Sequence, residues 1–217
     1  MKKTIQLIIA VIVISFAIGI IMYSRMPEQV ASHWNAAGDV DGYMSKFWGL
    51  FLMPIVTLAI FLLFLAIPYI DPLKKNIEKF RKYFDWFIYM MVLFLFYIYM
   101  LTIGWNLGYR FNMTLAILPA FAILFFIIGI VVERAERNWF IGIRTPWTLS
   151  DDDVWKKTHR LGGKMFKACA VLAVIGMLLP RYSVWFVLVP VMFTALFTII
   201  YSYVIFAKMK RKKSKKK

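Results

Sequence analysis

The sequence predicts an all-α integral membrane protein with six transmembrane helices and a short amphipathic cytoplasmic helix between the fourth and the fifth. Hydrophobic residues make up 62% of the 217 residues and the mean hydropathy is +0.70, above the usual apolar share of a soluble domain. The apolar residues form runs of about 20 residues, and most lysines and arginines lie between or beyond these runs.

Six apolar runs are long enough to cross a bilayer core about 30 Å thick as helices. Four of them carry internal proline or small residues, which helices in lipid tolerate because neighbouring helices satisfy the freed carbonyl groups. The runs are Ile5–Ser24, Phe47–Ile70, Trp86–Trp105, Met113–Val132, Lys164–Pro180 and Val184–Phe206.

Two of the runs leave alternatives open. The first follows Lys2 and Lys3 and has small residues at cleavage spacing, as a secretory signal does, but its apolar stretch continues to Tyr23, which favours a retained anchor helix. The fifth reaches spanning length only if Lys164 and Lys167 extend to the interface. Its short link to the sixth run favours a tight helical hairpin, with a re-entrant pair as the alternative.

The basic residues predict the orientation. If both termini are cytoplasmic, all but four of the 27 lysines and arginines lie inside, as the positive-inside rule prefers. We therefore predict a multi-pass protein of the cell (plasma) membrane, with the loop 25–46 outside and the loop 133–163, hereafter the polar loop, in the cytoplasm. The basic tail 207–217 is nearly free of apolar residues, so it is predicted to be disordered and held by anionic lipid.

Charge and cysteine content argue against several classes of function. The net charge of +16 comes from residues at the ends of apolar runs, so it indicates contact with the lipid bilayer and no direct nucleic-acid binding. The single cysteine, Cys169, permits neither an intrachain disulfide nor a cysteine-rich metal site. We predict no cofactor, no metal and no catalytic residue, because His159 has no obvious nucleophile beside it. The runs carry no ionisable side chain at their middles, which disfavours a proton- or ion-coupled transporter.

The loop 25–46 holds candidate ligand-facing residues. Pro27 suits the first turn of a short helix lying on the membrane surface, and Gly38 and Gly42 supply turns. A lone histidine is more often an interfacial hydrogen-bonding residue than a metal ligand, and the two aspartates of 39–42 are too few for a calcium loop. The residues expected to face an external peptide or lipid are His33, Trp34, Asn35, Asp41 and Tyr43.

The polar loop is the longest polar interruption between apolar runs. Ser150 has capping-box spacing to the last of the aspartates 151–153, which place negative charge where a helix N-terminus favours it. We expect a short amphipathic helix to begin there and Gly162-Gly163 to end it. A simple cytoplasmic elbow pinned by tryptophans and a functional surface are equally supported.

Both loops resemble sequences of a known family. The polar loop contains Asn-Trp-Phe-Ile-Gly-Ile-Arg-Thr-Pro-Trp-Thr-Leu-Ser at 138–150 and Val-Trp-Lys-Lys-Thr-His-Arg-Leu-Gly-Gly at 154–163, which resemble the signature of the SdpI family of bacterial immunity proteins. The loop 25–46, with its His-Trp-Asn at 33–35, resembles the short domain of unknown function that often precedes it. The signature residues are Asn138, Gly142, Arg144, Thr145, Pro146, Trp155, His159, Arg160 and Gly163.

The resemblance implies two parts of the chain and a function. Residues 1–70 are expected to form a first transmembrane hairpin, and residues 71–217 an SdpI-like four-helix membrane region that includes the polar loop and the basic tail. The implied function is a membrane immunity protein, not an enzyme, that protects against a secreted membrane-active peptide toxin. In the founding member the resemblance also implies signalling through a cytoplasmic transcriptional repressor. The alternative is a small-molecule or lipid transporter, which a solute flux lost on changing Asn106 or Arg110 would favour.

Overall fold

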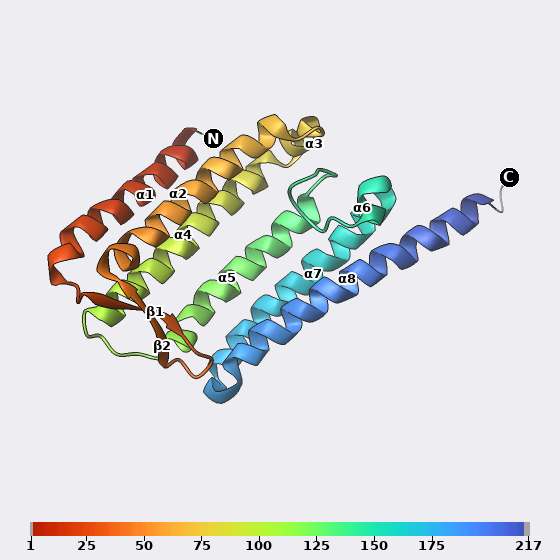
Figure 1. Ribbon diagram of the computed structural model, residues 1–217. Helices are drawn as coiled ribbons and strands as arrows, with labels where there is room; N and C mark the ends of the chain where they lie inside the picture. The colour runs from red at the N-terminus through yellow and green to blue at the C-terminus, as the bar shows by residue number, and fades with distance from the viewer. Residues whose placement is uncertain (1, 215–217) are drawn as a thin grey trace.

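The computed structural model describes residues 2–214, which form six long helices, a β-hairpin and several short turns (Figure 1). Each long helix overlaps one of the six apolar runs. The long helices are α1 (Lys2–Met22), α2 (Lys46–Ile70), α4 (Arg81–Asn106), α5 (Met113–Arg134), α7 (Asp152–Met177) and α8 (Ser183–Ser214). The short elements are η1 (Tyr23–Arg25), β1 (Gln29–Trp34), β2 (Val40–Ser45), α3 (Lys74–Lys79), α6 (Pro146–Ser150) and η2 (Pro180–Tyr182).

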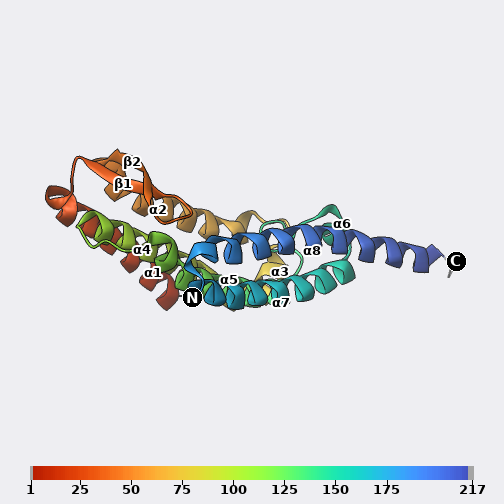
Figure 2. The ribbon, with the colours of Figure 1, turned by 90° about the horizontal axis from the view of Figure 1, so that it is seen from below.

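Successive long helices run in opposite directions, so the loops between them gather at two ends of the molecule. The N-terminus, α3 and α6 lie at one end, which we call the polar-loop end, and the β-hairpin lies at the other, the hairpin end (Figure 1). Helix α4 packs against α1 and α2, whereas α5 packs along α7 and α7 along α8. Helix α8 continues past its neighbours at the polar-loop end (Figure 2). The tight turn through η2 makes α7 and α8 the predicted helical hairpin.

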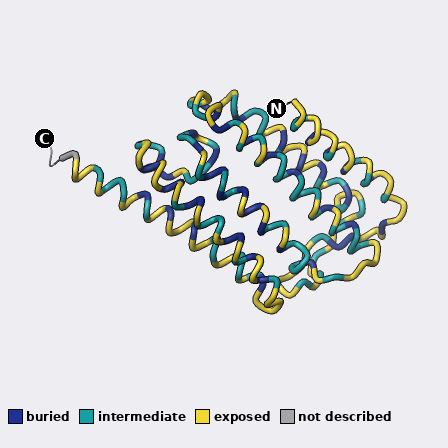
Figure 3. The backbone as a smooth tube through the Cα atoms, turned by 180° about the vertical axis from the view of Figure 1, so that it is seen from behind, coloured by how far each residue is buried: buried dark blue, intermediate teal, exposed yellow. Residues whose placement is uncertain are grey.

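The outward faces of the helices are apolar. Buried and exposed residues alternate along the long helices (Figure 3). Large apolar side chains such as Val13, Leu63 and Phe193 are more than half exposed. Water would disfavour so much exposed apolar surface, and a bilayer favours it. Within the described residues, five helices are long and apolar enough to cross a membrane, namely α1, α2, α4, α5 and α8. The chain is therefore a multi-pass α-helical membrane protein, and a span by charge-rich α7 stays a prediction.

The short surface helix predicted for the loop 25–46 is wrong. Strands β1 and β2 instead pair as an antiparallel two-stranded sheet, which adds a small β element to the all-α class. The turn uses Gly38 at φ +89°, a conformation that glycine adopts without steric cost. The Asn35 side chain accepts hydrogen bonds from the backbone N–H groups of Ala37 and Asp39, at 2.9 and 3.0 Å. Cross-strand pairing thus satisfies backbone groups that a helix of one or two turns would leave open.

The short amphipathic helix predicted in the polar loop is the first half of α7 and not a separate element. In this half, Val154, Trp155 and Thr158 are buried while Lys156 and Arg160 are exposed. The helix starts one residue later than the predicted cap. Asp151 is the N-cap, whose carboxylate accepts from two backbone N–H groups of the first turn, and Ser150 ends the preceding α6.

The prediction that Gly162 and Gly163 end this helix is wrong. Both are buried inside α7, with Gly163 close to α5 and Gly162 close to the polar loop. A Cβ placed on Gly163 would lie 2.6 Å from the carbonyl oxygen of Gly129, and one on Gly162 would lie 2.3 Å from Cδ1 of Ile143. The packing that such small residues permit offsets their low helix propensity, which costs about 1 kcal/mol per glycine.

The basic tail is not disordered as far as the structure describes it. Helix α8 extends through Ser214, and only residues 215–217 of the predicted tail lie outside the described residues. Lysine and arginine are good helix formers, and cations are favoured near a helix C-terminus by the macrodipole. A helix already fixed by its apolar part can therefore continue into a basic segment that has no core of its own.

Candidate functional site: a histidine-centred polar loop

Asn138 organises the turn that leaves α5. Its side chain is fully buried and uses all of its ordinary hydrogen-bonding groups. Oδ1 accepts from the backbone N–H groups of Phe140 and Ile141, at 2.9 and 2.6 Å, and Nδ2 donates to the carbonyl oxygens of Glu136 and Ile141, at 2.8 and 2.9 Å. The amide therefore takes the place of the regular backbone pairing that this segment lacks.

Two signature residues, Gly142 and His159, fit directly against each other. Gly142 has φ +111°, and a Cβ at that position would lie 2.3 Å from Nε2 of His159. The His159 ring stacks on the Trp155 ring, with centroids 3.8 Å apart and planes at 16°. The Trp155 indole N–H donates to the carbonyl of Ala135 at 2.7 Å, which ties α7 back to the end of α5. Only glycine leaves room for this arrangement.

The hydrogen bonds of His159 fix its tautomer. Nε2 accepts from the backbone N–H of Ile143 at 2.9 Å, so Nδ1 carries the proton and donates to the carbonyl of Trp155, also at 2.9 Å. Burial lowers the pKa of His159 to about 4, although its bond to the Trp155 carbonyl favours the protonated form. The ring is thus neutral at pH 7 with both nitrogens occupied. This geometry suits a structural pin better than a general acid or base.

Thr145 and Pro146 begin the short helix α6, which the sequence analysis did not predict. Thr145 and Thr148 form a reciprocal capping box, and Pro146 occupies the first turn. The Thr145 hydroxyl is also 3.0 Å from the hydroxyl of Ser202 on α8, and both side chains are buried. The capped turn therefore joins the polar loop to α8.

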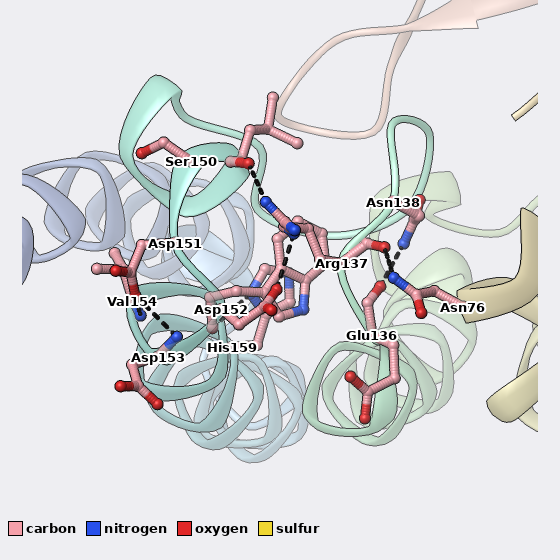
Figure 4. Close-up of polar contacts among 12 residues, drawn as sticks. Asn76, Glu136, Arg137, Asn138, Ser150, Asp151, Asp152, Asp153, Val154 and His159 are labelled. Atoms are coloured by element: carbon pink, nitrogen blue, oxygen red, sulfur yellow. Dashed lines mark hydrogen bonds and ion pairs between the residues drawn. The ribbon is translucent and has the colours of Figure 1, made fainter. Parts of the chain in front are cut away.

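A contact between two loops went unnoticed in the sequence. Asp71 is 2% exposed, and its carboxylate accepts from the backbone N–H groups of Leu73 at 2.6 Å and Trp139 at 2.9 Å. The Asn76 side chain donates to the carbonyl of Arg137 at 2.8 Å (Figure 4). The sequence does contain a signal for this contact, because Asp71 directly follows an apolar run and precedes a proline. A carboxylate buried at such a position needs N–H donors nearby.

Arg137 links the start of the polar loop to its end. Its Nη1 donates to the carbonyl of Leu149 at 2.8 Å, and its Nε is 2.8 Å from a carboxylate oxygen of Asp152 (Figure 4). The sequence predicts only helix capping for the aspartates 151–153. Asp151 performs that task, and Asp152 forms the ion pair.

The two signature arginines are exposed. Arg144 donates to the carbonyl of Trp139 at 2.7 Å. Arg160 makes no hydrogen bond or ion pair with residues 2–214, and it lines a polar pocket of about 690 Å³ between the end of α5 and α7. The structure thus gathers the signature residues into one region, with a buried framework beneath exposed cations.

The five candidates of the loop 25–46 all lie on or beside the hairpin, but they do not form one cluster. His33 Nδ1 lies 2.5 Å from a carboxylate oxygen of Asp41 across the strands, and Tyr43 is 61% exposed on β2. Trp34 instead packs edge-on against Trp105 of α4, with centroids 5.6 Å apart. Asn35 shapes the turn, as described above. The exposed surface therefore belongs mainly to the histidine, the aspartate and the tyrosine.

Two asparagines hold the hairpin to the helices. The Asn106 side chain accepts from the backbone N–H of Ala31 at 2.8 Å and donates to its carbonyl at 3.0 Å, as a neighbouring strand would. Asn112 caps α5 by accepting from the N–H of Leu115 and donates to the carbonyl of Ala37 at 2.8 Å. The hairpin thus sits on α4 and α5 through backbone contacts.

The fold and site define a class of multi-pass helical membrane proteins with a small β-hairpin at one end and a glycine–histidine polar loop at the other. Comparison with family models places the SdpI/YfhL protein family at residues 134–202 and the domain of unknown function DUF1648 at residues 10–58. The first match covers the polar loop, α7 and the first part of α8, and the second covers the later part of α1, the hairpin and the first half of α2.

Similarity to one known protein establishes the family of this chain. The chain is 30% identical over 210 residues to the immunity protein SdpI of Bacillus subtilis (strain 168), covering 96% of this chain and 98% of that protein. The chain belongs to the SdpI family, as its motifs indicated. No solved structure gives a significant match.

Proposed function

We propose that this protein is a membrane immunity protein that protects its cell against a secreted, membrane-active peptide toxin. The observation that carries the proposal is the similarity to the immunity protein SdpI, which extends over 98% of that protein and so includes both ends of the molecule. Five helices that are long and apolar enough to cross a membrane support a membrane location, where a membrane-active toxin would act. The matched relative is named as an immunity protein and not as an enzyme, and the engaged nitrogens of His159 are consistent with a non-catalytic role.

We assign the first contact with the toxin to the hairpin end, which faces outward in the orientation favoured by the positive-inside rule. Tyr43 is 61% exposed, and the side chains of His33 and Asp41 are 71% and 43% exposed. An exposed aromatic ring beside an imidazole–carboxylate pair offers apolar contact and hydrogen bonding to a peptide. These side chains are free for a partner because Asn106 and Asn112 hold the hairpin by its backbone.

We assign the polar-loop end to the cytoplasm, where it would brace the bundle or recruit a transcriptional repressor. The support is its construction, in which a buried framework underlies the exposed signature residues Arg144 and Arg160. A repressor would meet this surface without crossing the membrane. The link between the two ends runs through α5 and α7, which pack together closely at Gly129 and Gly163.

Immunity is tested by survival of a toxin-sensitive host that expresses the protein. Expression should restore growth in the presence of an SdpI-class toxin, and His33→Ala/Tyr43→Ala should reduce protection while the protein stays in the membrane fraction. Arg144→Ala should impair function with normal insertion, and Arg181→Ala, which removes an exposed arginine of the α7–α8 turn, is the matched control. Absence of protection against every related peptide would count against the proposal.

Orientation has its own test. Cys169 is 2% exposed, so single cysteines introduced at exposed positions can be labelled selectively. A membrane-impermeant maleimide on intact cells should label Ser45→Cys at the hairpin end and should label Lys210→Cys only after lysis. The reverse pattern would place the hairpin in the cytoplasm and exclude it as the first contact for a secreted toxin.

A further inference from the structure

One face of α7 carries a stripe of four cations, of which only Arg160 has a task in the proposed function. The four members recur every three or four residues, so they project from the same side of the helix. They are Lys156, Arg160, Lys164 and Lys167. Like charges at this spacing repel one another and disfavour the helix. A stripe of this kind is stabilised when anions neutralise it.

Among residues 2–214, an acidic partner neutralises only the last cation of the stripe. Lys167 donates to a carboxylate oxygen of Glu133 on α5 at 2.7 Å. The other three make no hydrogen bond or ion pair with any residue in the described range 2–214. They line the polar pocket of about 690 Å³ together with Arg134, and Glu136 is its one carboxylate not held by Lys167. The pocket thus has an excess of positive charge and space for an anionic group.

The same face of α7 becomes apolar immediately beyond Lys167. Val171, Val174 and Leu178 continue the spacing of three or four residues and are 60%, 50% and 79% exposed. The transition lies near the level at which the apolar span α5 ends, at Arg134. Cations followed by exposed apolar residues on one helical face match a molecule with an anionic head and a hydrocarbon chain.

We propose that this face of α7 is a binding site for an anionic phospholipid, with its phosphate in the pocket at Lys156, Arg160 and Lys164 and an acyl chain along Val171, Val174 and Leu178. A free phosphate would use the cations but not the apolar stripe. Bound lipid also explains how a helix with this much charge packs between α5 and α8, since the lipid supplies the anion that the chain lacks. The proposal is independent of toxin immunity.

The test compares binding of phosphatidylglycerol and phosphatidylcholine to the full-length protein in detergent, measured by native mass spectrometry. The variant K156Q/R160Q/K164Q removes three charges from the stripe, and K208Q/K210Q/K212Q removes three from the exposed end of α8. The stripe variant should bind phosphatidylglycerol on the order of 100-fold more weakly than the wild type, and R160Q alone about fivefold more weakly. The α8 variant should stay within about threefold of the wild type, and none of these substitutions should change phosphatidylcholine binding.

Three outcomes would overturn the proposal. Equal losses in the two triple variants would mean that only bulk charge attracts the lipid. Competition by glycerol phosphate at the affinity of phosphatidylglycerol would identify a soluble phosphate as the ligand. Wild-type affinity for phosphatidylglycerol in the stripe variant would place the lipid elsewhere. The three substituted side chains are exposed, so the unfolding temperature in phosphatidylcholine should equal or exceed that of the wild type.

Discussion

The two ends of the molecule are built in opposite ways. At the polar-loop end, buried Asn138, Trp155 and His159 each hold a specific hydrogen bond, and little space is left between them. At the hairpin end, asparagines hold the backbone, while His33 and Tyr43 remain exposed. The buried signature residues therefore serve mainly the close packing of the polar loop. The surface that is available to a ligand lies in the other loop, 25–46.

The largest expected effect comes from a methyl group at Gly142. Gly142→Ala must accept a left-handed φ and displace the His159 ring, so it should lower the free energy of unfolding by about 4 kcal/mol. The matched control is Gly108→Ala, where φ is +105° but nothing lies within 4 Å of the added Cβ. That variant should lose only about 1 kcal/mol. Thermal unfolding in detergent, followed by circular dichroism, measures both, and equal losses would show that the contact with His159 is unimportant.

The next effect compares two asparagines with similar roles. Asn138→Ala leaves buried N–H groups without acceptors and should cost about 3 kcal/mol. Asn35→Ala removes the equivalent bonds from an exposed turn, where water replaces them, and should cost about 1 kcal/mol. Denaturant unfolding of the two variants provides the comparison. A larger loss for Asn35→Ala would contradict the contrast between the two ends.

Acid should weaken the polar-loop end through His159. The folded-state pKa is about 4 and the ordinary value is 6.5, so between these values the unfolded chain binds the proton more tightly. Stability is therefore full above pH 6.5 and falls as the pH drops towards 4, with a loss of about 2 kcal/mol at pH 5. Unfolding temperatures at pH 7.5 and pH 5 should differ less in His159→Gln than in the wild type. The same pH dependence in both would remove His159 as the cause.

The smallest expected effect on stability lies in the hairpin. His33→Ala breaks an exposed pair with Asp41 and should change the free energy of unfolding by less than about 1 kcal/mol. A large drop in the unfolding temperature would show that the pair is structural. With the fold intact, any loss of protection reports on ligand contact.

The approximate positions of α1, α2, α4, α5 and α8 followed from the sequence because a bilayer core fixes the length and polarity of a spanning helix. Helix α7 begins at Asp152, well before the predicted run that starts at Lys164. The apolar run Phe47–Ile70 differs from α2 by a single residue at its start. The local signals at Pro27 and Gly162-Gly163 misled, because proline and glycine report what a short segment favours in isolation. Pairing across β1 and β2 decided the first case, and packing of Gly163 against Gly129 and of Gly162 against Ile143 decided the second.

The sequence by itself determined that the chain is a polytopic helical membrane protein, how its charges are distributed and which family its motifs resemble. Only the tertiary structure decided what most signature residues do. In the tertiary structure Gly142 packs against the His159 ring, Asn138 hydrogen-bonds within a turn, and the Asp71 carboxylate accepts from the backbone N–H of Trp139. Each apolar run or charged loop interacts with lipid or water by itself, so its effect can be predicted from the sequence. The contacts named above join positions on different helices and loops, so they exist only once the chain has packed.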